Sequence, residues 1–179
     1  MSEKVGGIFE DEMSLGMLEN SILYLLKTRT IHNSDTEKTL EGIYSGLAIM
    51  HRQEYSDDNA VYPTICFYLG EDRSNKAAYG GLFEKVMPIY FEGFCLVKTS
   101  GVLNYQRSRQ QRRNLRDNLG ALLTRYGGTF DIIDTSSGNA VIGGGHISEV
   151  RLSAIAGTFN FNGSGLITYH LVEGTETGN

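Results

Sequence analysis

Apolar residues recur at helical spacing near the N-terminus of the chain. They form one stripe of four leucine and isoleucine residues, widened by a fifth: Leu15, Leu18, Ile22, Leu25 and Leu26. This stripe predicts a helix over Glu12–Lys27. Acidic residues stand at its start and basic residues at its end, which is the polarity that the helix dipole favours.

The residues after this helix are polar and carry few strand signals. Residues 28–39 are expected to form a loop, in which Ser34–Glu37 has the capping-box spacing that would open a short helix through Tyr44. The next stretch, Ile43–Glu54, fits either a helical face or an alternating strand. We favour a strand over Ser45–Gln53, because two glycines weaken the helical alternative.

Two runs of β-branched and aromatic residues in the middle of the chain predict strands. One spans Thr64–Leu69, with Pro63 at its beginning, where a missing N–H group costs little. The other spans roughly Val86–Thr99. Because Pro88 and Gly93 lie inside this second run, we expect its strand to occupy an edge position or to contain a bulge.

A long, arginine-rich helix is predicted next, within Tyr105–Tyr126. The leucine spacing predicts it over Arg113–Tyr126 and leaves open a start as early as Gln106. Its expected buried face consists of four leucines: Leu115, Leu119, Leu122 and Leu123. The pair Gly127-Gly128 is expected to end it, because glycine commonly follows the last turn of a helix.

Glycine-rich segments divide the final third of the chain. Strands are expected at residues 130–133, 141–142, 147–156 and 165–172. Turns are expected at residues 136–139, 143–145 and 160–164. The two ends of the chain, residues 1–11 and 173–179, are expected to be flexible.

The size and composition predict one folded domain over residues 1–179. A chain of 179 residues with 40% apolar residues can bury a proper core. Cys66 and Cys95 lie inside apolar runs, where cysteine acts as a small buried hydrophobe, so we expect reduced thiols and a cytosolic folding environment. No run approaches the roughly 18 to 20 apolar residues of a membrane-spanning helix.

Charge is distributed unevenly along the chain. Residues 1–60 carry eleven acidic residues against five basic ones, and residues 105–125 carry six arginines against the single acid Asp117. Opposite charges on separate surfaces suit a subunit that meets copies of itself or a neighbour. Unevenly solvated faces explain the same distribution equally well. The formal net charge of −5 argues against general affinity for nucleic acid.

Residues suited to catalysis or metal binding are sparse. The four histidines are far apart in the sequence and have no metal-ligand spacing: His32, His51, His146 and His170. Gly143–Gly145 lacks the lysine and hydroxyl residue of a phosphate-binding loop. Asp131 and Asp134 have no partner acid to complete a site. We therefore predict no catalytic residue, no cofactor and no metal.

One cluster of arginines on the predicted long helix has a specific binding chemistry, since the planar guanidinium suits contacts with carboxylates or phosphates. It consists of Arg107, Arg109, Arg112, Arg113 and Arg116. Three interpretations remain open. The cluster is a solvated helix face, or it meets an acidic patch of a neighbouring subunit, or it contacts nucleic acid. The candidate acidic patches are the first helix and the loop that contains Asp57 and Asp58.

The order of the elements carries a further pattern. A strand led by Tyr-Pro ends in Gly-Glu at residues 62–71, and a second strand follows at residues 88–94. The long helix contains Leu-Arg-Asp-Asn-Leu at residues 115–119, and closing strands follow at residues 147–152 and 165–171. In this order the chain resembles the tail terminator proteins of tailed bacteriophages, also called tail-completion or neck proteins.

The resemblance covers most of residues 12–172, although Thr28–Gly46 and the Gly143 triplet have no counterpart in it. It implies an α+β fold in which two main helices pack on one side of a mostly antiparallel sheet. It further implies a virion protein, assembled in the host cytoplasm, that forms a hexameric ring. Such a ring caps the tail tube and sheath, stops tail polymerisation and presents a surface to the head–tail connector.

The resemblance implies no enzymatic activity, since the family has no catalytic residues, and it allows passive contact with DNA in the lumen of the ring. Two other classes remain open. One is another phage structural part, either a head-closure or neck adaptor or a tail-tube protein. The other is a small enzyme or nucleic-acid-binding protein.

Overall fold

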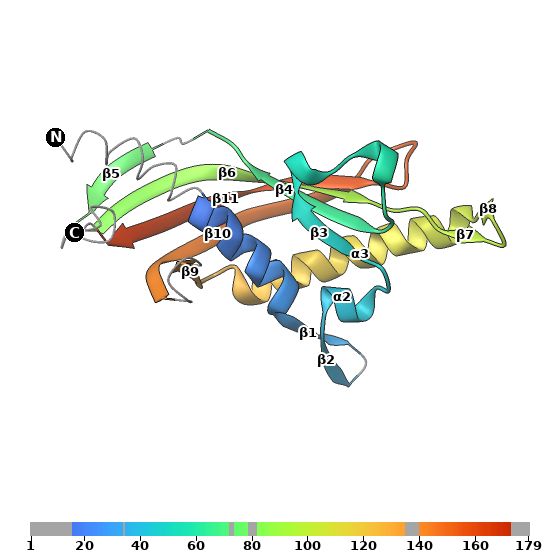
Figure 1. Ribbon diagram of the computed structural model, residues 1–179, viewed down its shortest axis with the longest axis horizontal. Helices are drawn as coiled ribbons and strands as arrows, with labels where there is room; N and C mark the ends of the chain where they lie inside the picture. The colour runs from blue at the N-terminus through green and yellow to red at the C-terminus, as the bar shows by residue number, and fades with distance from the viewer. Residues whose placement is uncertain (1–15, 34, 72–73, 79–81, 135–139, 173–179) are drawn as a thin grey trace.

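A mostly antiparallel sheet forms the centre of the computed structural model, which describes residues 16–33, 35–71, 74–78, 82–134 and 140–172 (Figure 1). Its strands are β3 (Ala48–His51), β4 (Thr64–Leu69), β5 (Ser74–Ala78), β6 (Leu82–Phe94), β9 (Phe130–Asp134), β10 (Ala140–Ala154) and β11 (Phe161–Val172). Six of them follow the order β3-β4-β6-β11-β10-β9, and β5 pairs with β6 beside this path. Only β3 and β4 pair in parallel among these strands. The segments predicted to be flexible, residues 1–11 and 173–179, lie outside the described residues.

Two helices supply the apolar side chains that cover one face of the sheet. The first helix is described from residue 16 to residue 28, and α3 spans Tyr105–Tyr126. Their buried apolar side chains were predicted: Leu18, Ile22, Leu25 and Leu26 on the first helix, and Leu115, Leu119, Leu122 and Leu123 on α3. The fifth residue of the first stripe, Leu15, lies outside the described residues. They share one core with Phe67, Ile89, Phe91 and Ile167 of the sheet. The predicted α+β class is therefore confirmed.

The polar segment after the first helix is a hairpin, so its prediction as a loop was wrong. Strands β1 (Thr30–Asn33) and β2 (Thr36–Thr39) pair in antiparallel fashion. Asp35 takes a φ of 69° in the turn between them, a left-handed conformation that Asp tolerates better than most residues. Thr36 and Glu37 of the predicted capping box belong to β2, so they do not open a helix. The short helix α2 (Leu40–Ile43) is capped instead by Thr39, whose hydroxyl accepts the N–H of Gly42 at 3.1 Å.

The ambiguous stretch that follows contains a strand, as favoured, but a shorter one. Gly46 takes a φ of 79° in the turn before β3. After β3 the chain enters the short 3₁₀ helix η1 (Arg52–Glu54). His51 ends the strand by accepting the N–H of Gln53 on its Nδ1 atom at 3.2 Å.

The proline in β6 does not mark an edge or a bulge, so that prediction was wrong. Strand β6 is paired on both sides, and its register with β4 and β11 has no shift. The carbonyl of Pro88 accepts the N–H of Gly70 at 2.8 Å. On that side β6 changes partner, from β5 at Val86 to β4 at Ile89, so the missing N–H of proline falls between the two pairings. Beyond β6, the small hairpin of β7 (Lys98–Thr99) and β8 (Val102–Leu103) leads into α3.

The glycine triplet is not a turn. Residues 143–145 lie inside β10 and pair with β11 on one side and β9 on the other, which joins two predicted strands into one. The predicted turn at residues 160–164 was also misplaced. The chain reverses at residues 155–160, where Gly157 takes a φ of 76°, and β11 begins at Phe161. Gly93 of β6 leaves room for the ring of Phe161, which would lie 2.0 Å from a Cβ atom there.

Candidate interaction surfaces

The start of α3 is fixed by its own cap and by a buried serine. The side chain of Asn104 accepts the N–H of Arg107 at 3.0 Å. The hydroxyl of buried Ser108 accepts the N–H of Val97 at 2.9 Å and donates to the Val97 carbonyl at 3.3 Å. These bonds hold the arginine-bearing half of the helix against the segment that leaves β6.

Helical geometry divides the five predicted arginines into two sets. Arg109, Arg112, Arg113 and Arg116 are three or four residues apart and share one side of α3, and we call them the arginine row. Arg107 stands two residues before Arg109, about 200° around a helix with 3.6 residues per turn. The structure therefore separates Arg107 from the other four.

Two arginines of the row are already engaged within the chain. The Nη1 atom of Arg112 donates to the carbonyls of Ile155 and Thr158, which holds the turn between β10 and β11 against α3. Arg116 lies 3.4 Å from a carboxylate oxygen of its neighbour Asp117. Arg109 and Arg113 are exposed, and neither has an ion-pair partner among the residues that the structure describes.

A depression of about 600 Å³ lies between this half of α3 and the turn after β10. We call it the arginine groove. It is lined by Tyr105, Arg109, Arg112, Ala154, Ala156, Gly157, Thr158 and Phe159. The ring of Tyr105 meets that of Phe159 edge to face, with 5.6 Å between the centroids, yet the Tyr105 side chain remains 63% exposed. The groove thus combines an aromatic floor with guanidinium groups.

The two predicted acidic residues belong to η2 (Asp57–Asn59), a short 3₁₀ helix on the segment between β3 and β4. Both are exposed, and the N–H of Asp58 bonds to the Ser56 hydroxyl at 3.3 Å. Val61 and Tyr62 follow and are 49% and 40% exposed. We call Asp57, Asp58, Val61 and Tyr62 the acidic patch.

Stacked rings support the acidic patch from beneath. Tyr55 stacks on Phe94 with 4.3 Å between the centroids, and the guanidinium of Arg52 lies 5.1 Å from the centre of the Tyr55 ring. Burial raises the pKa of Tyr55 to about 12, and hydrogen bonds with Asp57 and Tyr62 act in the same direction. The phenol therefore stays neutral at physiological pH.

The arginine row and the acidic patch lie on opposite faces of the sheet. Phe91 of β6 points into the core that the leucines of α3 complete. Because side chains alternate along a strand, Phe94 points to the other face, where Tyr55 stacks on it. Figure 1 shows α3 on one side of the long strands and the segment after β3 on the other, near the same end of the sheet. At that end the turn after β10 reaches both surfaces, since Gly157, Thr158 and Phe159 line the arginine groove and also a depression beside Asp57 and Tyr62.

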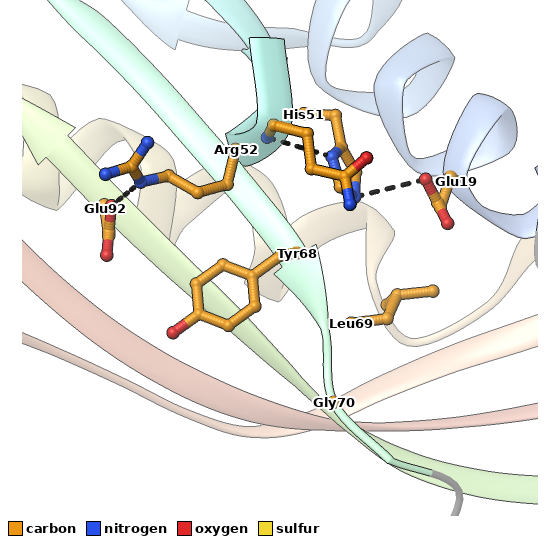
Figure 2. Close-up of a pocket in the computed structure, with 8 residues that line it drawn as sticks. Glu19, His51, Arg52, Tyr68, Leu69, Gly70 and Glu92 are labelled. Carbon is orange, nitrogen blue, oxygen red and sulfur yellow. Dashed lines mark hydrogen bonds and ion pairs between the residues drawn. The ribbon is translucent and has the colours of Figure 1, made fainter. Parts of the chain in front are cut away.

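A second cavity, of about 530 Å³, lies between the first helix and the sheet and is lined by several polar side chains (Figure 2). His51 accepts the Gln53 N–H on Nδ1, so its neutral ring carries the proton on Nε2, 3.2 Å from Oε2 of Glu19. On the other side of the cavity, the Nε atom of Arg52 donates to Oε2 of Glu92 at 2.7 Å. Sequence patterns gave no signal for this site, since its pairs join residues from separate elements.

The pairs in this cavity serve to tie elements together. Each carboxylate already faces a cation or a ring N–H. Cys66 is the cross-strand partner of Glu92, but its thiol is fully buried, and Cys95 is buried in the core. The other histidines meet different partners: His32 faces Glu37, His146 faces the Gly128 carbonyl, and His170 faces Glu84. Within the described residues, no three His, Cys, Asp or Glu side chains gather as metal ligands would.

Comparison with protein-family models and with curated proteins finds no match for this chain. Among the described residues, no helix combines the length and the apolar character needed to cross a bilayer.

Proposed function

We propose that this protein is a structural subunit of a bacteriophage tail, a tail terminator that assembles head to tail into a closed hexameric ring. In the virion the ring caps the tail tube and sheath, stops their growth and offers a surface to the head–tail connector. The subunit is assembled in the host cytoplasm and works by contact between surfaces.

The observation that carries the proposal is the position of the two charged surfaces. A head-to-tail ring requires one surface of each copy to meet a different surface of the next copy. The arginine row and the acidic patch have opposite charge and lie on opposite faces of one sheet, so they suit such a contact. The α+β architecture, with helices over one face of a mostly antiparallel sheet, agrees with the tail terminator resemblance.

The test is the mass of the purified protein in solution, measured by light scattering over a range of protein and salt concentrations, together with particle images. A closed six-membered ring that weakens as salt rises is the expected result, because salt screens exposed charges. Long stacks of rings would identify a tail-tube protein instead.

A second measurement addresses the other class of function. If the protein stays monomeric at high concentration and also fails to bind phage tails that lack their terminator, the proposal is wrong. Salt-dependent binding of DNA by that monomer would then favour a small nucleic-acid-binding protein.

A further inference from the structure

Four of the large apolar side chains that the structure leaves exposed belong to the two charged surfaces or to the segment that leads into them. Six such side chains are exposed in the described part of the chain: Tyr24, Val61, Tyr62, Val102, Tyr105 and Val141. Val61 and Tyr62 belong to the acidic patch. Tyr105 lines the arginine groove, and Val102, 69% exposed, precedes it on β8. Exposed aromatic residues beside unpaired charge are typical of protein contacts.

The two surfaces are complementary in chemistry as well as in charge. One offers carboxylates with an aromatic and a branched side chain, and the other offers guanidinium groups over an aromatic floor. A depression of about 600 Å³ falls in the size range of natural binding pockets, so it has room for a tyrosine side chain.

We propose that the acidic patch of one copy docks into the arginine groove of the next. Tyr62 enters the groove beside Tyr105 and Phe159, while Asp57 and Asp58 pair with Arg109 and Arg113. This inference rests on the proposed function and names the contact through which the ring closes. Arg112 does not take part directly, since its guanidinium already holds the turn that forms the groove wall.

Charged groups that make no ion pair within the chain support this assignment of roles. Neither Arg109 nor Arg113 has an ion-pair partner among the described residues, and the same is true of the carboxylates of Asp57 and Asp58. A neighbouring copy can supply ion-pair partners to these four groups, while the Asp57 carboxylate and the Tyr62 hydroxyl also hydrogen-bond to Tyr55 within the subunit.

Two charge-reversal variants test the contact. The first is Asp57→Arg with Asp58→Arg, and the second is Arg109→Asp with Arg113→Asp. Each variant alone sets like charges against each other at every interface, so its assembly is expected to require at least a tenfold higher protein concentration. A mixture of the two is expected to assemble at wild-type concentrations as a ring of alternating copies, because every interface again joins opposite charges.

The aromatic part of the contact has its own variant and matched control. Tyr62→Ser is expected to raise the concentration needed for assembly about tenfold, since aromatic anchors carry much of the energy of an interface. Tyr24→Ser removes a tyrosine of the first helix that is 49% exposed, against 40% for Tyr62, and is expected to leave assembly unchanged. Sedimentation velocity measures assembly, and circular dichroism with thermal unfolding checks that each variant folds.

The outcomes separate this inference from the proposed function. If the wild type forms rings and both charge-reversal variants assemble as it does, the contact is wrong while the ring stands. A third variant carries all four substitutions in one chain, which exchanges the charges of the two surfaces. The contact is also wrong if the folded two-substitution variants fail to assemble when mixed and this third variant fails to assemble as well. If the wild type itself never assembles, the proposed function fails first.

Discussion

The ring of Phe130 occupies the space in which a side chain at Gly145 would lie, with its nearest atom 2.4 Å from the Cβ position there. Phe130 belongs to β9 and Gly145 to β10, and the two residues are direct partners across the strands. The ring packs over bare backbone and remains buried. The glycine therefore allows an aromatic side chain to reach the core at this edge of the sheet.

Gly145→Ala is expected to lower the free energy of unfolding by about 1 to 3 kcal/mol, the usual cost of overpacking a core. The matched control is Gly144→Ala, because the nearest atom to its Cβ position is 3.8 Å away. That variant is expected to change stability by less than about 0.5 kcal/mol. Urea denaturation of both variants measures the difference, and equal costs would show that Phe130 can move aside.

The same pair explains where sequence reasoning failed. Local rules assign three successive glycines to a turn, since glycine is the usual turn residue. Nothing near Gly145 in the sequence points to Phe130, so the real reason for the glycine is a long-range contact. The prediction for Pro88 failed for a similar reason. Between Val86 and Ile89, β6 changes partner from β5 to β4, so no neighbouring strand requires an N–H group from Pro88, and the local sequence does not reveal this change.

Elements set by local apolar periodicity were predicted correctly. The stripe through Leu18 and Ile22 and the leucine face of α3 are buried as expected. The candidate surfaces were found only in part. Spacing alone separates Arg107 from the arginine row, whereas the groove depends on residues 154–159, which the fold brings beside α3 from far along the chain.

Ser21 makes a bond that joins the first helix to the edge strand β9. Its buried hydroxyl donates to the Met17 carbonyl at 2.7 Å and accepts the N–H of Ile133 at 2.9 Å. Ser21→Ala leaves that N–H without its partner, so a loss of about 1 to 3 kcal/mol of unfolding free energy is expected.

The control is Thr28→Ala on the same helix, because the Thr28 hydroxyl is exposed and bonds to the carbonyl four residues earlier within the helix. Chemical denaturation is expected to show a change below about 0.5 kcal/mol for this control. Hydrogen exchange at Ile133 gives a second readout and is expected to quicken only in Ser21→Ala. Unchanged exchange there would contradict the proposed bridge.

Both thiols are expected to be unreactive in the folded protein. Burial raises the pKa of Cys66 and of Cys95 to about 12. At pH 8 only about one thiol in ten thousand would then be ionised, and the thiolate is the reactive form. Modification by a coloured disulfide reagent is expected to be slow in buffer and complete within seconds in denaturant. Fast modification of either thiol in buffer would contradict this burial.

Glu37 and Arg125 form an exposed ion pair that joins the β1–β2 hairpin to the end of α3. The Nη1 atom of Arg125 lies 3.0 and 2.9 Å from the two carboxylate oxygens of Glu37. The hydrogen bond from Arg125 is the main cause that lowers the pKa of Glu37 below its ordinary value of 4.5. A carboxyl group with a lowered pKa stabilises the fold above its unfolded-state pKa, and this contribution is lost as pH falls through the folded-state pKa.

Arg125→Gln is therefore expected to raise the pKa of Glu37 toward 4.5 and to remove that pH-dependent contribution. An NMR titration of the Glu37 carboxyl between pH 2 and 7 measures the shift directly.

Arg107→Gln is the control, because Arg107 is an exposed arginine of the same helix that is not bonded to Glu37. High salt is expected to shrink the difference between wild type and Arg125→Gln, since the pair is open to solvent. An identical Glu37 pKa in both proteins at low salt would show that the pair does not persist in solution.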